Sequence, residues 1–212
     1  MDVLNLIAPT NSTLKLILLI NLNISDIMIE VEVKAHVKDF NSVKNALSNL
    51  NAERIKTEYQ EDIYFNAPHR DFAKTDEALR IRKVSKTGFK DSKYEKLILT
   101  YKGKKMDSIS KTRKEIEVEI KDMEKISAIL ENIGFLPVAK VNKKRIIYNY
   151  QGFIISLDDV LNVGNFVEIE TEAHEGENFE DSLKQIFEIY KKLGIKNGFE
   201  RRSYLELMGI YI

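Results

Sequence analysis

Charged and apolar side chains alternate along six stretches of this chain. In the first stretch, Glu30, Glu32 and Lys34 alternate with Val31 and Val33. Successive side chains of a β-strand point to opposite faces, so this spacing predicts a strand with one apolar face and one ionic face. The ionic faces of the other five stretches are formed by Arg80/Arg82, Thr100/Lys102, Arg113/Glu115/Glu117/Glu119, Lys143/Arg145 and Glu168/Glu170/Glu172.

The ionic faces admit two interpretations. An antiparallel sheet with one solvated face would carry a mixture of Ser, Thr, Lys, Glu and Gln, and for any single strand this is the better interpretation. Here the faces are nearly pure carboxylate or nearly pure Lys and Arg. If the sheet curls so that these faces meet, like charges become partly desolvated and need counter-ions. The repetition over the six stretches favours the curled sheet.

A curled sheet of this kind predicts two ligands. Clustered carboxylates offer the hard oxygen ligands that bind divalent cations. Clustered Lys and Arg offer charge-assisted hydrogen bonds to a polyanion, and a phosphate chain bridged to the metal would satisfy both sets. The pattern therefore favours a metal and phosphate site inside the sheet.

Three stretches have the period of amphipathic helices. Asp39 and Asp122 stand where N-caps are expected, and Gly134 and Gly194 stand where the second and third helices would end. We expect these helices to pack outside the sheet. Their apolar stripes are Phe40/Val43/Leu47/Leu50, Met123/Ile126/Ile129/Leu130/Ile133 and Phe179/Leu183/Ile186/Phe187/Tyr190/Leu193.

The first two helices each lie inside a strand–helix–strand unit. One unit leads from the strand at Glu30 to residues 60–65, and the other leads from the strand at Glu115 to residues 143–148. The similar length and order suggest two related halves, and the whole pattern predicts mostly antiparallel β-structure with helices outside. Further strands are expected at about 78–83, 96–102 and 153–159, with turns at Gly152, Asn162 and Gly164.

Composition limits the classes of function. The 212 residues, 43% of them hydrophobic, fit one domain with a real core. With 33 basic and 33 acidic residues the formal charge is +0, which gives no support to nonspecific binding of nucleic acid or a membrane surface. The absence of Cys excludes disulfides, thiolate zinc sites and Cys nucleophiles, and it is compatible with the cytoplasmic location that we expect.

Residues 1–27 differ from the rest of the chain. They are rich in Leu, Ile and Asn, and their best apolar run, 14–20, contains Lys15 and is too short to span a bilayer. No positive region and no small-residue cleavage site mark a signal peptide. Because Met28 directly precedes the first patterned strand, we expect 1–27 to be a dispensable extension and 28–212 to form a single domain; the alternative is a strand or helix that covers a sheet edge.

Other side chains that could take part in chemistry or binding have simpler interpretations. The three histidines, His36, His69 and His174, are too dispersed for a recognisable metal motif. We expect a surface or capping role for His36 and loop positions for the other two. The tyrosines and phenylalanines near the strands are expected to pack the barrel rather than stack on bases. The basic clusters 102–105 and 143–145 lack an accompanying basic excess or aromatic motif, so RNA binding is disfavoured.

Eight ordered motifs resemble those of the CYTH superfamily, also called triphosphate tunnel metalloenzymes. The superfamily includes class IV adenylate cyclases, thiamine triphosphatases and inorganic triphosphatases, and the layout is most similar to the cyclase branch. The first motif alone is weak evidence for this resemblance, whereas the ordered set from 28 to 204 is strong evidence. The motifs are E-x-E-x-K at 30–34, Q-x-D-x-Y-F at 60–65, L-R-I-R at 79–82, T-Y-K-G at 100–103, R-x-E-x-E at 113–117, K-x-R at 143–145, a turn at Asp158 and G-x-F-x-E-x-E at 164–170.

The resemblance implies an α+β fold, a closed eight-stranded antiparallel tunnel with helices outside, that binds a triphosphate with Mg²⁺ or Mn²⁺. It implies a small-molecule triphosphate as partner, and the oligomeric state stays open, with a homodimer as one arrangement. The implied catalytic residues are Lys34 and Arg113. The implied metal side is Glu30, Glu32, Glu115, Glu117, Asp158, Glu168 and Glu170, and the implied phosphate side is Lys34, Arg80, Arg82, Lys102, Arg113, Lys143 and Arg145.

Three functions are compatible with such a tunnel. In a cyclase the ribose 3′-hydroxyl of ATP attacks the α-phosphorus and pyrophosphate leaves; in a triphosphatase water attacks the terminal phosphorus. Both reactions rest on in-line positioning and charge neutralisation. A noncatalytic polyphosphate- or nucleotide-binding module is the third. The resemblance favours the cyclase.

Overall fold

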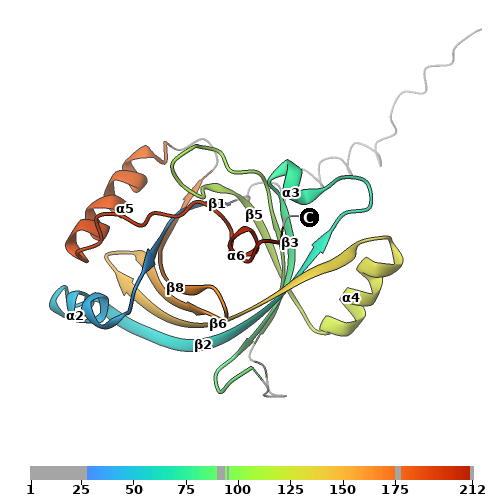
Figure 1. Ribbon diagram of the computed structural model, residues 1–212, viewed down its shortest axis with the longest axis horizontal. Coiled ribbons are helices and arrows are strands. Elements are labelled where there is room, and N and C mark those ends of the chain that lie inside the picture. The colour runs from blue at the N-terminus through green and yellow to red at the C-terminus, as the bar shows by residue number, and fades with distance from the viewer. Residues whose placement is uncertain (1–27, 90–93, 95, 175–177, 211–212) are drawn as a thin grey trace, which may run out of the picture.

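The computed structural model describes residues 28–89, 94, 96–174 and 178–210, and the predicted dispensable extension, 1–27, lies outside the described residues. Eight antiparallel strands form a closed barrel in the order β1-β5-β4-β3-β2-β6-β7-β8 (Figure 1), which confirms the predicted fold class. The strands are β1 Met28–Val37, β2 Glu53–Asn66, β3 Ala78–Ser85, β4 Lys96–Lys102, β5 Arg113–Ile120, β6 Leu136–Tyr150, β7 Phe153–Val160 and β8 Gly164–His174. The helices are α2 Asn41–Asn49, α3 Phe72–Thr75, α4 Met123–Asn132, α5 Glu180–Lys192 and α6 Tyr204–Leu207.

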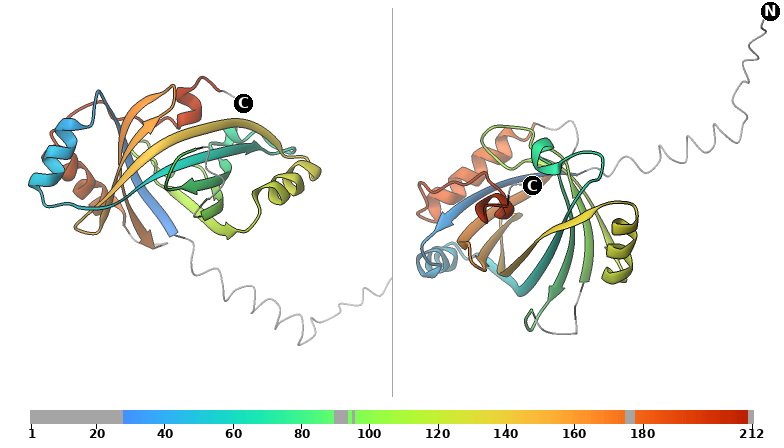
Figure 2. Two further views of the ribbon diagram at one scale, coloured as in Figure 1. Left: turned by 90° about the horizontal axis from the view of Figure 1, so that it is seen from below. Right: turned by 45° about the vertical axis from the view of Figure 1, so that its right-hand side comes forward.

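Most of the hydrophobic core lies outside the barrel, between the strands and the helices, and a smaller cluster inside the barrel packs Tyr204 against Val141, Val160 and Phe166. Helices α2 and α5 cover β1, β7 and β8 on one side, and α4 covers β3 on another side (Figure 2). Val31 is fully buried in this outer layer, while its neighbour Glu32, which points inward, is only 3% exposed. Both faces of β1 are therefore buried, which excludes the solvated-face interpretation for this strand.

Local sequence explains where the helices begin and end. Asp122 accepts a hydrogen bond from the backbone N–H of Lys125 at 2.9 Å and caps α4, as predicted. Asp39 accepts from Asn41 at 2.7 Å, but the N-cap of α2 is Phe40, so this prediction was one residue too early. Gly134 follows α4 with a φ of +96°, a backbone conformation that costs glycine little.

The barrel order agrees with two related halves. The units β1–α2–β2 and β5–α4–β6 lie so that β1 pairs with β5 and β2 pairs with β6. Exchanging each strand for the one four positions later in sequence reproduces the same order around the barrel. The strand–helix–strand repeat is thus a property of the whole topology.

Two local predictions were wrong. Asp158 does not lie in a turn, because β7 continues to Val160 and the chain turns at Asn162, whose φ is +63°. His174 is the last residue of β8 rather than a loop residue. Pairing of Lys143 with Val160 carries β7 past Asp158, and pairing of Met28 with His174 includes the histidine in β8.

The segment that carries α6 runs into the barrel and lies within the ring of strands in Figure 1. It is tied to β1 by backbone hydrogen bonds of 2.8 Å from His36 to Gly198 and from Glu200 to Lys34. Ser203 and Glu206 form a capping box at the start of α6. Tyr204 is thereby held with its side chain buried inside the barrel. None of the helices in the described part of the chain is long and apolar enough to cross a bilayer.

Candidate functional site

A cavity of about 1160 Å³ occupies the interior of the barrel. Every strand contributes at least one lining residue, and α3 and α6 line the part near one end. The charged lining follows from the alternation in sequence, because the apolar side chains of the same strands point outward to the helices. The ionic faces predicted from sequence do meet inside the barrel.

The charges are divided between two walls. The acidic wall consists of three consecutive strands, β8, β1 and β5, and the basic wall consists of β4, β3 and β6 together with β2. A ligand that spans the cavity would contact carboxylates on one side and cations on the other. The acidic wall presents Glu30, Glu32, Glu115, Glu117, Glu168 and Glu170, and the basic wall presents Arg80, Arg82, Lys102, Lys143 and Arg145. Arg113, at the start of β5, is a cation on the acidic side.

Three carboxylates of the acidic wall, hereafter the carboxylate trio, come close enough to share one cation. Glu30, Glu32 and Glu170 each place an oxygen so that these atoms lie within 4.8 Å of one another. Enclosure in the barrel and the charges of Glu30 and Glu32 raise the pKa of Glu170 to about 8. Among the described residues, no side chain donates a hydrogen bond to Glu170. The donor set therefore fits a hard divalent metal ion.

Two further carboxylates, Asp158 and Glu168, hereafter the paired carboxylates, are held by Arg145. Asp158 is fully buried and accepts two hydrogen bonds of 2.6 Å from Arg145 and one of 3.0 Å from Lys143. Arg145 also donates to Glu168. Burial would raise the pKa of Asp158, but Arg145 and Lys143 outweigh it and lower the pKa. These contacts make Asp158 a partner of Arg145 and do not bring it into the carboxylate trio.

Tyr204 completes the surroundings of the paired carboxylates. Its hydroxyl lies 2.9 Å from Asp158 and 3.0 Å from Glu168. Its ring lies over the ammonium of Lys34 at 4.1 Å from the centroid. Sequence reasoning missed this residue, because it lies in the short helix α6, where no alternation indicates that it points into the barrel.

On the basic wall, Asp62 organises the arginines. It is 1% exposed and accepts hydrogen bonds of 2.7 and 2.8 Å from Arg82, with Arg80 at 3.6 Å. Arg80 also donates to Thr100 at 3.2 Å and to Glu117 at 3.4 Å, while its Nε is buried without an acceptor among the described residues. Arg82 therefore has a bidentate partner in Asp62, whereas the contacts of Arg80 are longer and divided among several groups.

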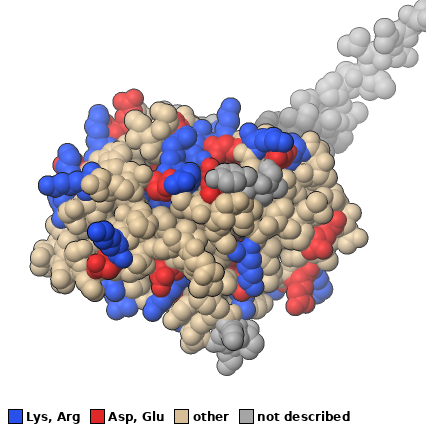
Figure 3. All heavy atoms as spheres, viewed as in Figure 1, with Lys and Arg blue, Asp and Glu red and all other residues tan. Residues whose placement is uncertain are grey.

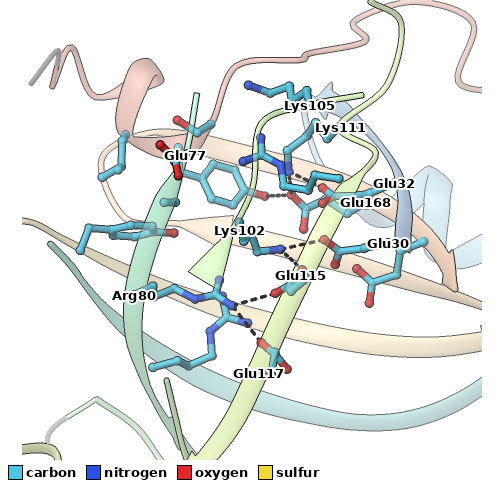
Figure 4. Close-up of a pocket in the computed structure, with 18 of the residues that line it drawn as sticks. Glu30, Glu32, Glu77, Arg80, Lys102, Lys105, Lys111, Glu115, Glu117 and Glu168 are labelled. Carbon is cyan, nitrogen blue, oxygen red and sulfur yellow. Dashed lines mark hydrogen bonds and ion pairs between the residues drawn. The ribbon is translucent and has the colours of Figure 1, made fainter. Parts of the chain in front are cut away.

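Lys102 joins the two walls. It donates to Glu30 at 2.7 Å and to Glu115 at 2.5 Å (Figure 4). Glu117 accepts from Thr100 at 2.7 Å. Thus Glu115 and Glu117, two of the seven predicted metal ligands, are bound to groups of β3 and β4, and Glu115 shares Lys102 with Glu30 of the carboxylate trio.

The two predicted catalytic residues have different positions. Lys34 is 1% exposed, donates to the carbonyl of Arg202 at 2.5 Å and does not line the cavity. Burial and the Lys111 ammonium lower its pKa to about 7. Arg113 does line the cavity, and its nearest carboxylate, Asp76, is 3.8 Å away. Arg113 is thus available to an anion, whereas Lys34 lies behind Tyr204.

Two cations of the cavity were missed by the sequence interpretation. Lys105 pairs with Asp76. Lys111 pairs with Glu32 (Figure 4). Both lie in the connection between β4 and β5. Lys111 precedes Arg113 by two residues, so the alternation of β5, followed backward by one step, would have indicated it.

The remaining predictions concern the outside of the molecule. His36 packs edge-on against Phe166 with ring centroids 5.2 Å apart, and His69 is exposed in a turn, so neither lines the cavity. On the face shown in Figure 3, Lys and Arg are interspersed with Asp and Glu. That face carries no continuous basic patch of the kind that binds nucleic acid.

Comparisons with known proteins agree with this geometry. A putative adenylate cyclase of Methanocaldococcus jannaschii is 44% identical over 184 residues, which cover 86% of this chain and 100% of that protein. The adenylate cyclase CyaB of Aeromonas hydrophila is 27% identical over 180 residues, covering 84% and 87%. A Pyrococcus horikoshii protein of known structure is 42% identical with a TM-score of 0.76, covering 84% of this chain and 97% of that one. The family model of the CYTH domain matches residues 28–204, and the chain belongs to this family.

Proposed function

We propose that the protein is a metal-dependent enzyme that converts ATP to cyclic AMP and pyrophosphate. The observation that carries the proposal is the opposition of an acidic and a basic wall across one cavity. A metal-bound triphosphate has the matching distribution of charge. Two relatives with 44% and 27% identity carry the name adenylate cyclase, one of them as putative, which supports this branch of the family.

The carboxylate trio would hold the metal. A divalent ion there would supply charge neutralisation at the phosphates and lower the pKa of an oxygen bound to it. The predicted metal ligands Asp158 and Glu168 would instead support phosphate binding, because they hold Arg145 and Lys143 in place. We therefore assign metal binding first to Glu30, Glu32 and Glu170.

The phosphate chain would lie along the basic wall and reach Arg113 at the start of β5. Of the seven predicted phosphate-binding residues, all except Lys34 line the cavity. The carboxylate contacts of Arg113 and Arg80 are long, 3.4–3.8 Å, so these two residues are the strongest candidates for direct contact. We keep Lys34 as a catalytic candidate on the basis of its pKa of about 7, which suits a proton acceptor; contact with substrate would require Tyr204 to move.

The proposed reaction forms a bond from the ribose 3′-oxygen to the α-phosphorus and breaks the bond from the α-phosphorus to the oxygen that leaves with pyrophosphate. The proton of the 3′-hydroxyl must be accepted by a protein group or by water. Phe72 and Ala73 near α3, and Leu205 and Ile210 near α6, give the cavity an apolar part. This part supports a nucleotide rather than an inorganic triphosphate as substrate, since a base needs such a surface.

The test is product analysis by chromatography after incubation of the protein with ATP and Mg²⁺ or Mn²⁺. Cyclic AMP and pyrophosphate in equal amounts are expected. ADP with orthophosphate, or faster release of phosphate from tripolyphosphate or thiamine triphosphate, would instead make the protein a triphosphatase. Tight triphosphate binding without turnover of any of these substrates would make it a binding module.

A further inference from the structure

Lys111 occupies an unusual position beside the carboxylate trio. Its Nζ pairs with Glu32 and lies 3.4 Å from Glu168, and its side chain is 14% exposed toward the cavity. Figure 4 shows the ammonium between these two carboxylates. The contact with Glu32 uses an oxygen of the residue that we assign to the metal. In the protein without metal, Lys111 is therefore a counter-ion of the metal site.

The backbone around Lys111 is fixed, so the side chain alone can change partner. The N–H of Lys111 donates to the carbonyl of Glu32 at 2.9 Å, and Met106 donates to Thr112 at 2.8 Å. Arg201 donates through Nε to the carbonyl of Ser110 at 3.0 Å. These bonds attach the connection between β4 and β5 to β1 and to the segment before α6. An ammonium that leaves Glu32 stays within reach of the cavity.

The alternatives open to Lys111 are limited once Glu32 is taken. Glu168 already accepts from Arg145 and lies 3.0 Å from the Tyr204 hydroxyl, and its contact with Lys111 is the longer one. Lys102 differs, because it would keep Glu115 after losing Glu30. A divalent cation at the carboxylate trio would thus displace one lysine without an equivalent acidic partner. A metal-bound phosphate chain would supply the missing anion.

We propose that Lys111 couples metal binding to triphosphate binding. It neutralises Glu32 in the metal-free protein, competes with the metal for that carboxylate, and moves to the phosphate chain when the metal binds. The proposal rests on the proposed function, since it takes a triphosphate as the ligand of the cavity. Lys111 acts here as a binding residue that exchanges Glu32 for the phosphate chain, and by reciprocity each ligand raises the affinity for the other.

The test is a set of binding titrations on the full chain, with Lys111→Met, with Lys111→Arg as the charge-conserving variant, and with Lys105→Met as the matched control. Lys105 lines the same cavity but pairs with Asp76, so its variant measures the effect of removing a nearby charge without competition. The ligands are Mn²⁺ alone and imidotriphosphate, a triphosphate that resists hydrolysis, with and without saturating Mn²⁺.

We expect Lys111→Met to bind Mn²⁺ alone about three- to tenfold more tightly than the parent, because the competing ammonium is gone. With Mn²⁺ present it should bind imidotriphosphate about tenfold more weakly, as for the loss of a charge-assisted hydrogen bond. Without Mn²⁺ the affinity for imidotriphosphate should be nearly unchanged. Lys111→Arg should behave like the parent.

Equal Mn²⁺ affinities in Lys111→Met and Lys105→Met would overturn the proposal, as would a loss of imidotriphosphate affinity that is the same with and without Mn²⁺. These readouts are independent of turnover. A parent protein that makes cyclic AMP but shows no Lys111-dependent coupling contradicts only this inference. A parent protein with the coupling but without cyclic AMP contradicts only the proposed reaction.

Discussion

The carboxylate trio and the paired carboxylates lie in the same barrel and face the same interior, yet their pKa values are shifted in opposite directions. The pKa of Glu170 is raised to about 8 by its enclosure and by two neighbouring carboxylates. The pKa of Asp158 is lowered, because Arg145 and Lys143 outweigh an even deeper burial. The difference comes from the guanidinium partner and not from depth.

This difference distinguishes two groups of carboxylates: a framework group, which holds cations of the protein in place, and a ligand group, which is available to a bound cation. A carboxylate that has a bidentate arginine is satisfied by the protein and holds that arginine in place. A carboxylate that is surrounded mainly by other carboxylates has a raised pKa and is available to a bound cation. In this barrel Glu170 is such a carboxylate, and Glu30 and Glu32 beside it contact one lysine each, Lys102 and Lys111.

Removing the arginine should have the largest effect. Arg145→Met leaves Asp158 and Glu168 buried without their main partner, so we expect the free energy of unfolding to fall by about 3–5 kcal/mol. Urea denaturation followed by circular dichroism, without metal, measures it. Lys140→Met is the control, because the Lys140–Glu61 pair of 2.7 Å has a lysine side chain that is 53% exposed, and it should cost no more than about 1 kcal/mol. Similar losses in the two variants would contradict the framework role.

Two carboxylates on one face of β8 can be compared by the substitutions Glu170→Gln and Glu168→Gln, through their effects on metal affinity and on stability. We expect Glu170→Gln to lower the affinity for Mn²⁺ by about 10- to 100-fold, because it removes a hard anionic ligand while keeping the size of the side chain. Glu168→Gln should lower Mn²⁺ affinity less but destabilise the protein more, since it breaks the contact with Arg145. Calorimetric titration and denaturation of both variants provide the comparison. The reverse ranking would show that the trio is not the metal site.

The pH dependence of stability should follow from Glu170. Its pKa in the folded protein is about 8, above the ordinary value of 4.5, so its contribution is full below 4.5 and is lost as the pH rises through 8. Between pH 5 and 7 the metal-free parent should lose about 1.4 kcal/mol per pH unit relative to Glu170→Gln. Denaturation curves at several pH values measure this difference. Parallel curves for the two proteins, or a slope that persists with saturating Mn²⁺, would contradict the assignment.

Tyr204→Phe should have the smallest effect on stability. It removes the hydroxyl contacts with Asp158 and Glu168 but keeps the ring over Lys34. Because both carboxylates retain Arg145, we expect a loss of about 1–1.5 kcal/mol in the free energy of unfolding. Thermal and urea denaturation provide the measurement. A loss as large as that of Arg145→Met would mean that Tyr204, and not the arginine, is the main partner.

Much of the fold could be predicted because alternation is a local property. The spacing of Glu30, Glu32 and Lys34 against Val31 and Val33 fixes which side chains share a face. Both faces of this strand are buried, as the nearly uniform charged composition of the ionic faces indicated. The helix stripes and the glycines that follow α4 and α5 are local in the same sense. The closed barrel itself was implied by the resemblance and not by the pattern.

The pairing of charges could not be predicted in the same way. Glu168 and Glu170 lie on the same face of β8, but among the described residues only Glu168 accepts a hydrogen bond from Arg145, which lies two strands away on β6. Which cation reaches which carboxylate depends on the register between strands distant in sequence and on connections such as the one that carries Lys111. The sequence therefore predicts the set of site residues better than their division into framework and ligand groups.

The closure of the barrel by β1 and β8 has a consequence for folding. These strands pair along the whole of β1, from Met28 with His174 to Val37 with Asn165, so the partners lie more than a hundred residues apart. Closure of such distant contacts is slow, and an unpaired β1 exposes an open edge that can associate with other chains. The carboxylates are desolvated only when the ring of strands closes. The electrostatic cost of bringing the acidic side chains together therefore arises in this late step of folding. We therefore expect refolding to slow as the ionic strength decreases and to be accelerated by Mn²⁺, a cation that the nascent interior can bind.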